Sequence, residues 1–365
     1  MRDFLAERLL VKIMEWTPEE TSEERPLLQA LASFKYDSYQ QFSTGIRFIE
    51  SLVRWLNQFE ELSERKTAYE FIKNHLIFIS NEQMAYLVNI AFNDKINPII
   101  IIKTANELNI KEHLVAKIIN SKEYQSNLRK SLFIGLSDGS RIDYLRRSSN
   151  INNEQVSTTH EISHEKVKDM LSELEIALGE KCKFHTVFLV DDFSASGKSY
   201  FRPEEKKGKL WKFLDKVFSA KDNPTIDQKD WESLVDSENI RIHVLFYIAT
   251  QSAVDTIQSN IDEWKNTKNI TNEIKVYAIQ IIDNSIKFNV ESKVEFVELA
   301  KKYFDDKIIN RHYSLGKHDN PHLGFNECGL PLILNHNTPN NSLPILWLPD
   351  DMKYKGLFPR VTRHK

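Results

Sequence analysis

Four short apolar runs alternate with helical patterns between residues 131 and 305, and this alternation constrains the fold more than any other feature. The runs are LFIGLS (132–137), TVFLVDD (186–192), RIHVLFYIA (241–249) and EIKVYAIQII (273–282). Strands that alternate with helices predict an α/β fold, in which a parallel sheet carries helices on both faces. Ligands of such sheets bind beyond the carboxyl ends of the strands. The loops SDGS and DDFSASGKS fall at such ends.

The glycines and prolines divide the chain into three zones. The first 134 residues contain one of the ten glycines, whereas six of the 11 prolines lie between residues 321 and 359. In the first zone, TGIRFIESLVRWLNQFEEL has apolar residues at three- and four-residue spacing, which is typical of an amphipathic helix. The polar stretch 222–237 is predicted to be a surface excursion. The predicted domains are a helical N-terminal domain (1–128), an α/β core (129–310) and a loop-rich C-terminal hood that completes the core (311–365).

Charge and cysteine content argue against several classes of protein. A net charge of −3 and a pI of about 6.4 do not fit a globally basic nucleic-acid binder. Cys182 and Cys328 are too few for a disulfide framework or a four-cysteine zinc site. No apolar run approaches the roughly 18 to 20 residues of a membrane span, and the N-terminal segment carries charges through its apolar stretch, unlike a signal peptide. The sequence therefore predicts a soluble, cytoplasmic protein without a membrane partner.

The most specific stretch is VFLVDDFSASGKSY, residues 187–200. An apolar strand ends in Asp191 and Asp192, and small residues and one lysine follow over 194–199. Such a loop can wrap a phosphate with backbone N–H groups and hydroxyls at a helix N-terminus, while the carboxylates accept bonds from two ribose hydroxyls. The pattern predicts a site for a ribose 5-phosphate. A Walker A loop competes for SGKS, but its first glycine would fall on Asp192, whose charge would face the nucleotide phosphates.

The run from Val187 to Ser199 resembles the signature with which type I phosphoribosyltransferases bind phosphoribosyl pyrophosphate (PRPP). The resemblance implies that Asp191 and Asp192 contact the ribose hydroxyls. Lys198 stands where the family often has a small residue. The residues implied to bind the ribose 5-phosphate are Ser194, Ala195, Ser196, Gly197, Lys198 and Ser199. Those implied to form a pyrophosphate loop are Ser137, Asp138, Gly139 and Ser140.

The wider chain resembles the phosphoribosyltransferase-like proteins of bacterial conflict (antiphage) systems. The resemblance rests on RWLNQF and FISNEQMAYL, on GLSDGSRIDYLRR, and on LPLILNHNTPNNSLPILW with LFPRVTRH. It implies a Rossmann-like phosphoribosyltransferase core and a defence effector that uses PRPP and Mg²⁺ to modify an acceptor. Other defence-system proteins are then expected to bind the N-terminal helices, and nucleic acid stays open as a partner.

Phosphoribosyl transfer needs positioning and stabilisation of charge more than covalent catalysis. Mg²⁺ on the pyrophosphate oxygens would neutralise the leaving group, and Arg141 would add a forked, charged contact to the same oxygens. A solvated arginine at a helix start is the alternative for Arg141. We expect the acceptor to lie under a hood that contains Asn335, His336 and Asn337, since amides offer donors and acceptors together and histidine can move a proton. Turn formation is the alternative role of these asparagines.

Three other functions remain open from the sequence. The same fold without catalytic activity would sense PRPP or a nucleotide, or bind a partner in a defence complex. HEISH, residues 160–164, matches His-Glu-x-x-His and would make a zinc hydrolase if both histidines shared one helical face. TANELNIKEHLVAKII, residues 104–119, has helix-turn-helix spacing, with Asn109 where the turn often has glycine.

Overall fold

The computed structural model of the chain separates into two compact units. Unit 1 joins residues 1–83 to residues 283–365, and unit 2 comprises residues 84–282. The residues that the structure describes are 3–149, 151–218, 225–291, 294–310, 313–317 and 319–361. This division differs from the predicted boundaries after residues 128 and 310. The helices before the sheet belong to the unit of the sheet, and the C-terminal segment belongs to the unit of the N-terminal helices.

Unit 2 contains a five-stranded parallel sheet in the order β3-β2-β4-β5-β6. The strands are β2 (Ser131–Gly135), β3 (Val156–Ser157), β4 (Thr186–Ser194), β5 (Arg241–Thr250) and β6 (Ile274–Ile282). The predicted α/β class is therefore confirmed, and four of the strands coincide with the four apolar runs. The two-residue β3 has no apolar run to reveal it. The sheet order reverses between β2 and β4, because the chain places β3 on one side of β2 and all later strands on the other.

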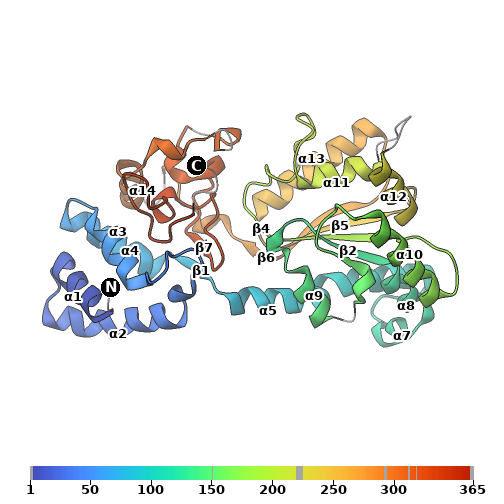
Figure 1. Cartoon of the computed structure of the whole chain (residues 1–365), viewed down its shortest axis with the longest axis horizontal. Coiled ribbons are helices and arrows are strands. Elements are labelled where there is room, and N and C mark those ends of the chain that lie inside the picture. Colours follow the sequence, from blue (N-terminus) through green and yellow to red (C-terminus); the bar gives the residue numbers. More distant parts are fainter. Residues whose placement is uncertain are drawn as a thin grey trace. The chain divides into compact units, whose positions relative to one another are not determined.

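Helices cover both faces of this sheet, as the alternation predicts (Figure 1). Those that pack apolar side chains into the core beside the strands are α10 (His164–Leu178), α11 (Lys209–Phe218), α12 (Ile226–Leu234) and α13 (Gln251–Lys268). α8 and α9 lie against β2, and α11 and α13 appear on the opposite side of the sheet (Figure 1). The remaining helices of unit 2 are α5 (Asn81–Ala91), α6 (Asn97–Leu108), α7 (Val115–Ile119), α8 (Lys122–Arg129) and α9 (Ile142–Ser148).

The stretch 222–237 is not the surface excursion that its polarity predicts. Residues 222–224 lie outside the described residues, and α12 forms directly afterwards. Thr225 and Gln228 make a reciprocal capping box at its start, with bonds of 3.0 and 3.3 Å. Trp231 and Leu234 are buried in the core of unit 2. Two apolar residues on one helical face are enough to anchor a short helix, although they leave the average composition polar.

Unit 1 is built from both parts of the chain that belong to it. Its helices and strands are α1 (Asp3–Met14), α2 (Pro18–Phe34), α3 (Phe48–Asn57), α4 (Leu62–Asn74), β1 (Ile77–Ile79), α14 (Val294–Lys302) and β7 (Leu332–Leu334). β1 and β7 pair in parallel, with Phe78 opposite Ile333. The indole N–H of Trp55 donates to the Ile345 carbonyl at 2.8 Å, and the Ser51 hydroxyl donates to the Leu357 carbonyl at 2.6 Å. These long-range contacts explain why the C-terminal segment packs here.

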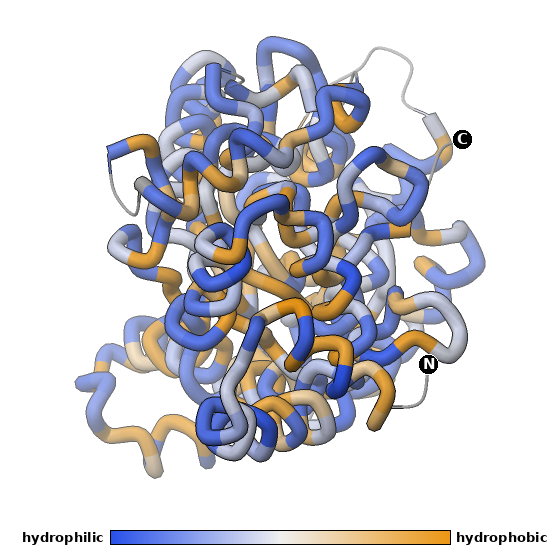
Figure 2. The backbone as a smooth tube through the Cα atoms, turned by 90° about the vertical axis from the view of Figure 1, so that its left-hand side faces the viewer, coloured by the Kyte–Doolittle hydropathy of each residue, from blue (hydrophilic) through white to orange (hydrophobic). Residues whose placement is uncertain are grey.

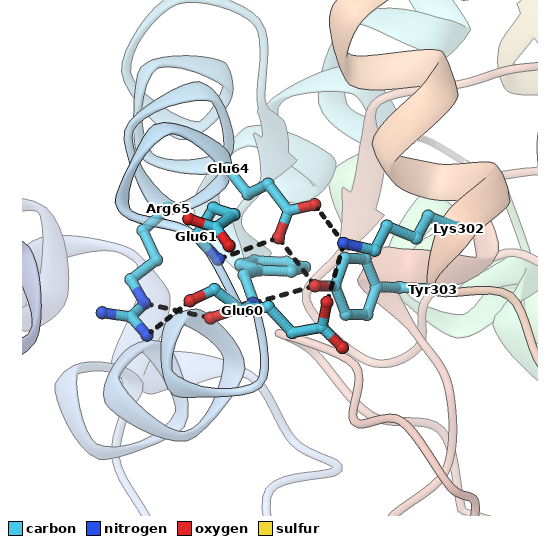
Figure 3. A network of polar contacts seen from close by, with 7 residues as sticks. Glu60, Glu61, Glu64, Arg65, Lys302 and Tyr303 are labelled. Atoms are coloured by element: carbon cyan, nitrogen blue, oxygen red, sulfur yellow. Dashed lines mark hydrogen bonds and ion pairs between the residues drawn. The ribbon is translucent and has the colours of Figure 1, made fainter.

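A network of charged and polar side chains also connects the start of α4 to the end of α14 (Figure 3). The Lys302 ammonium donates to Glu64 at 2.7 Å and to Glu60 at 3.0 Å. The Tyr303 hydroxyl donates to the second oxygen of Glu64 at 2.7 Å and accepts from the Glu60 N–H at 2.9 Å. Since exposed ion pairs add little stability, the network mainly fixes how α14 lies on α4.

Hydrophobic and hydrophilic residues are interspersed along the chain (Figure 2). In α3 the buried side includes the apolar residues whose spacing predicts the helix, Phe48, Ile49, Leu52, Val53 and Leu56. At the start of α5, Ser80 and Gln83 form the capping box that their spacing suggests, with bonds of 3.0 and 3.2 Å. No helix in the described part of the chain is long and apolar enough to cross a membrane.

Candidate functional site

The two predicted ligand loops follow the carboxyl ends of neighbouring strands in unit 2. β2 and β4 are adjacent and parallel, so the loop over 137–141 and the loop over 194–199 leave the same edge. This edge is also the point where the strand order reverses. In open α/β sheets the crevice at such a reversal is the usual ligand site. The fold therefore brings together the two segments that the sequence identifies separately.

The paired acids lie within β4 and not beyond its end. β4 continues to Ser194 because β5 also continues and pairs with it, with Asp191 opposite Phe246 and Ser194 opposite Ala249. Successive side chains of a strand point to opposite faces of the sheet. Asp191 and Asp192 therefore face different surroundings, whereas the resemblance implies one shared role.

Asp191 is completely buried, and both of its carboxylate oxygens are already bonded. Oδ1 accepts from the Ser137 hydroxyl and from the Asp192 N–H, the latter at 3.1 Å. Oδ2 accepts from the Tyr200 hydroxyl at 2.9 Å and from the Lys209 ammonium at 2.8 Å. Burial raises the pKa of Asp191, as does the charge of Asp192, while Lys209 and Ser137 act to lower it. A ribose hydroxyl could reach Asp191 only by replacing one of these donors.

Asp192 is half-buried and lies against the loop that follows β2. A methyl group on Gly139 would stand 2.6 Å from Asp192 Oδ2, so a larger residue there would displace the carboxylate. The hydroxyl of Tyr247 lies near this charge as well. Burial raises the pKa of Tyr247, and the charges of Asp191 and Asp192 raise it further. Asp192 is therefore less enclosed by the protein than Asp191.

The small-residue loop packs tightly between β5 and α13. Ser194 to Gly197 are buried, Lys198 is half-buried and Ser199 is exposed. Gly197 has φ of 71°, and a methyl group on it would stand 2.9 Å from Ile257 of α13, which explains the glycine. The Thr250 hydroxyl holds the carbonyl of Ala195 at 2.6 Å. The predicted helix N-terminus does not follow directly, because α11 begins only at Lys209.

Arg141 and the predicted pyrophosphate residues form a tight turn before α9. Ser137 to Ser140 enter a single 3-10 turn, and Arg141 follows in the left-handed region with φ of 47° and ψ of 33°. An L-residue held in that region stores strain, which is typical of functional turns. Ser140 is buried, Asp138 is exposed, and Ser137 is bonded to Asp191. This loop and β4 are therefore physically connected.

Sequence reasoning misses Tyr200 and Lys209 as members of this site. Tyr200 directly follows the small-residue loop. Residues 201–208 then form a small excursion, in which Arg202 and Lys207 pair, before Lys209 returns to the acid. Contact between Lys209 and Asp191 depends on this excursion, so no short spacing in the sequence reveals it.

The predicted hood residues lie in unit 1, where they stabilise its structure. The Asn335 amide donates to the carbonyl and the hydroxyl of Ser38, at 2.6 and 2.8 Å. Gln41 donates to the His336 carbonyl at 2.9 Å and to the Asn337 side chain at 3.1 Å. These contacts match the alternative in which the asparagines build turns. A role in binding an acceptor stays a prediction.

HEISH does not form the helical face that a zinc protease needs. α10 begins at His164, with Ser163 as its N-cap, so His160 lies before the helix. His164 Nδ1 pairs instead with Asp230 at 2.6 Å. Among the residues that the structure describes, no three of His, Cys, Asp or Glu gather as a metal site. The geometry therefore does not support the zinc hydrolase.

The helix-turn-helix interpretation of 104–119 fails on the length of the second helix. Asn109 does adopt the left-handed conformation that a turn glycine would, with φ of 50°. However, α7 has only five residues, Val115–Ile119, and is too short to lie along a DNA groove as a recognition helix.

Comparison with known proteins identifies one family. The family model described as PRTase-CE matches residues 52–360, which includes the sheet, both loops and most of unit 1. Searches of curated proteins and of solved structures returned no match. The family match agrees with the resemblance that the loop residues and the flanking motifs suggest.

Proposed function

Because the chain belongs to the PRTase-CE family, which is phosphoribosyltransferase-like, we propose that unit 2 binds PRPP at the edge of its sheet and transfers the phosphoribosyl group to an acceptor. In this proposal Asp192 accepts hydrogen bonds from the ribose hydroxyls. The loop 194–199 binds the 5-phosphate, and the loop 137–141 binds the pyrophosphate.

One observation carries the proposal. The loop after β2 lies against the end of β4 at the point where the strand order reverses, and Gly139 leaves its space to Asp192. A sugar with a phosphate at one end and a pyrophosphate at the other needs two anion-binding loops with a carboxylate between them. The contact of the 137–141 loop with β4, and the 194–199 loop that follows Asp192, support this assignment of roles.

Transfer would break the bond between ribose C1 and the pyrophosphate oxygen and form a bond from C1 to the acceptor. Mg²⁺ bound with PRPP would supply positive charge to the departing pyrophosphate. Magnesium usually keeps several waters and phosphate oxygens and needs only one or two protein carboxylates, which fits Asp192. Arg141 would hold pyrophosphate oxygens from the protein side.

Calorimetric titration of PRPP with Mg²⁺ into the whole chain tests the proposal. Asp192→Asn should lower the affinity at least about 100-fold while the variant stays folded, because the interaction of a charged acceptor with two hydroxyls is lost. Asp255→Asn is the matched control, since Asp255 is exposed on α13. If wild-type protein binds no PRPP, or if Asp192→Asn binds it equally well, the proposal is wrong.

A catalytically inactive PRPP sensor is the second candidate, and one observation favours it. Both oxygens of Asp191 are bonded to donors of the protein, whereas the resemblance assigns both adjacent acids to the ribose. Release of pyrophosphate from bound PRPP, measured across nucleobases, nucleotides, RNA and proteins as acceptors, separates the two functions. A sensor would bind PRPP with the same affinity whichever acceptor is present, and it would release no pyrophosphate.

The defence role is part of the proposal through the resemblance of the flanking motifs. It predicts that bacteria expressing the protein resist phage better than bacteria expressing the Asp192→Asn variant at equal abundance. Equal resistance of the two strains would separate any defence role from this site. The same resemblance suggests that other defence-system proteins bind the N-terminal helices.

A further inference from the structure

The carboxylate of Asp191 is at the centre of a buried cluster that joins four parts of unit 2. Its donors come from the loop after β2 (Ser137), from β4 itself (the Asp192 N–H), from the end of the small-residue loop (Tyr200) and from the first residue of α11 (Lys209). The Tyr200 hydroxyl also lies 2.8 Å from the Phe193 carbonyl, so its one proton is shared between that carbonyl and Asp191. Protein donors nevertheless contact both carboxylate oxygens of Asp191.

Lys209 supplies the only full positive charge among these four donors. Its ammonium also lies 5.0 Å from the centre of the Tyr200 ring, which helps to fix its position. The Lys209 side chain is 38% exposed, whereas Asp191 is 0% exposed. Removing one partner of a buried ion pair leaves an uncompensated charge and is strongly destabilising, whereas replacing both by neutral groups is often tolerated. Replacing Lys209 or Asp191 alone should therefore destabilise the protein more than replacing both together.

We propose that Lys209 is a positioning residue of the ligand site. It neutralises Asp191, and Asp191 in turn fixes Ser137, so that the 137–141 loop is held beside Asp192. Asp191 is then a structural acid and not a ribose contact. The inference rests on the proposed function for the identity of the ligand, but the coupling between Lys209 and Asp191 can be measured without any ligand.

A double-mutant cycle tests the inference in the whole chain. The variants are Lys209→Met, Asp191→Asn and the two combined. Thermal unfolding of the unliganded proteins is followed between pH 5 and pH 8.5, and PRPP with Mg²⁺ is titrated at pH 7.5. Lys209→Arg keeps the charge and should restore most of the loss, and Tyr200→Phe provides a milder variant if the single charge variants do not fold.

The expected pH dependence follows from the environment of Asp191. Burial raises its pKa in the folded protein, so the carboxylate destabilises the fold increasingly as the pH rises from the ordinary value of 3.8 through the raised one. Lys209 acts to lower this pKa, so its removal raises the pKa of Asp191 further and extends the destabilised pH range to higher pH. Lys209→Met should therefore lose more stability at pH 8 than at pH 5, and the double variant should lose this pH dependence.

Lys209→Met should lower the affinity for PRPP about 10-fold or more, because the 137–141 loop is less well positioned. The double variant should bind within about fivefold of wild type, while Asp192→Asn loses about 100-fold. If the folded double variant loses binding as fully as Asp192→Asn, Asp191 contacts the ligand and the inference is overturned, although the proposed function stands. Strictly additive effects on unfolding also overturn it. Failure of wild type to bind PRPP instead rejects the proposed function, and the unliganded cycle still decides whether Lys209 and Asp191 act together.

Discussion

Replacing Phe358 by alanine should lower the melting temperature of unit 1 while leaving that of unit 2 unchanged. The Phe358 side chain is completely buried, although it lies close to the end of the second segment of unit 1. Its ring centre lies 5.2 to 5.8 Å from the ring centres of five aromatic residues in the first segment, Tyr36, Tyr39, Phe42, Phe48 and Phe78. The residue therefore joins the two segments at the middle of one aromatic cluster.

The size of the effect follows from this environment. Truncation of a buried phenylalanine to alanine costs about 3–5 kcal/mol, and the loss of several aromatic contacts places Phe358 in the upper part of that range. For a unit of this size each kcal/mol lowers the Tm by about 2–4 °C, so unit 1 should melt about 10–15 °C earlier. Unit 2 should keep its own transition, because it has a separate core.

Hydrogen exchange read by mass spectrometry can follow the two units separately during heating. Peptides from α3 and β1 should lose protection together with those around Phe358, whereas peptides from β4 and β5 should not. Phe34→Ala is the matched control, because Phe34 is 88% exposed and its truncation should change the Tm by less than about 2 °C. The reasoning is refuted if Phe358→Ala shifts the transition no more than this control, or if protection is lost only in the C-terminal peptides.

Three further predictions concern single side chains. Burial lowers the pKa of His243 to about 3, so the free energy of unfolding should fall by roughly 1.4 kcal/mol per pH unit as the pH drops below about 6.5. His243→Phe should remove this dependence in an acid titration followed by circular dichroism. An unchanged profile would contradict the prediction. Gly139→Ala should displace the carboxylate of Asp192 by about 1 Å and weaken PRPP binding about 10- to 100-fold in calorimetry, and an affinity within twofold of wild type would argue against contact with the ligand. Burial raises the pKa of Glu64, but its hydrogen bonds, with Lys302 first among them, outweigh burial and lower it below 4.5. The Tm difference between Glu64→Gln and wild type should therefore be present at pH 7 and shrink as the pH falls from 4.5 through the lowered pKa, whereas a constant difference would exclude the charge as its cause.

Much of unit 2 follows from local sequence patterns. Apolar runs bounded by turn residues are sufficient to locate the four longer strands, because a buried parallel strand must be apolar on both faces. Strand alternation with helices is also sufficient for the class of fold. The pairing of β1 with β7 cannot be found in this way, since the contact joins residues 77–79 to residues 332–334 and has no local signal.

The candidate site shows the same limit at the level of single residues. The loops after β2 and β4 can be predicted, because parallel neighbours end at the same edge. Successive side chains of a strand point to opposite faces, so Asp191 and Asp192 must differ in their surroundings if β4 continues past both of them. That continuation depends on the length of β5, and the contact with Lys209 depends on the excursion at 201–208. Both are properties of the folded chain.

The insertion of unit 2 between the two segments of unit 1 has a consequence for synthesis. During translation the last strand of unit 2 ends at Ile282, so the sheet can be complete while β7 and Phe358 have not yet been made. Domains generally fold as units in the order in which they leave the ribosome. The apolar sides of the N-terminal helices therefore stay exposed to solvent until the C-terminal segment has been synthesised. A nascent chain of this protein is expected to need a chaperone during that interval, although it begins with the helices that finish folding last.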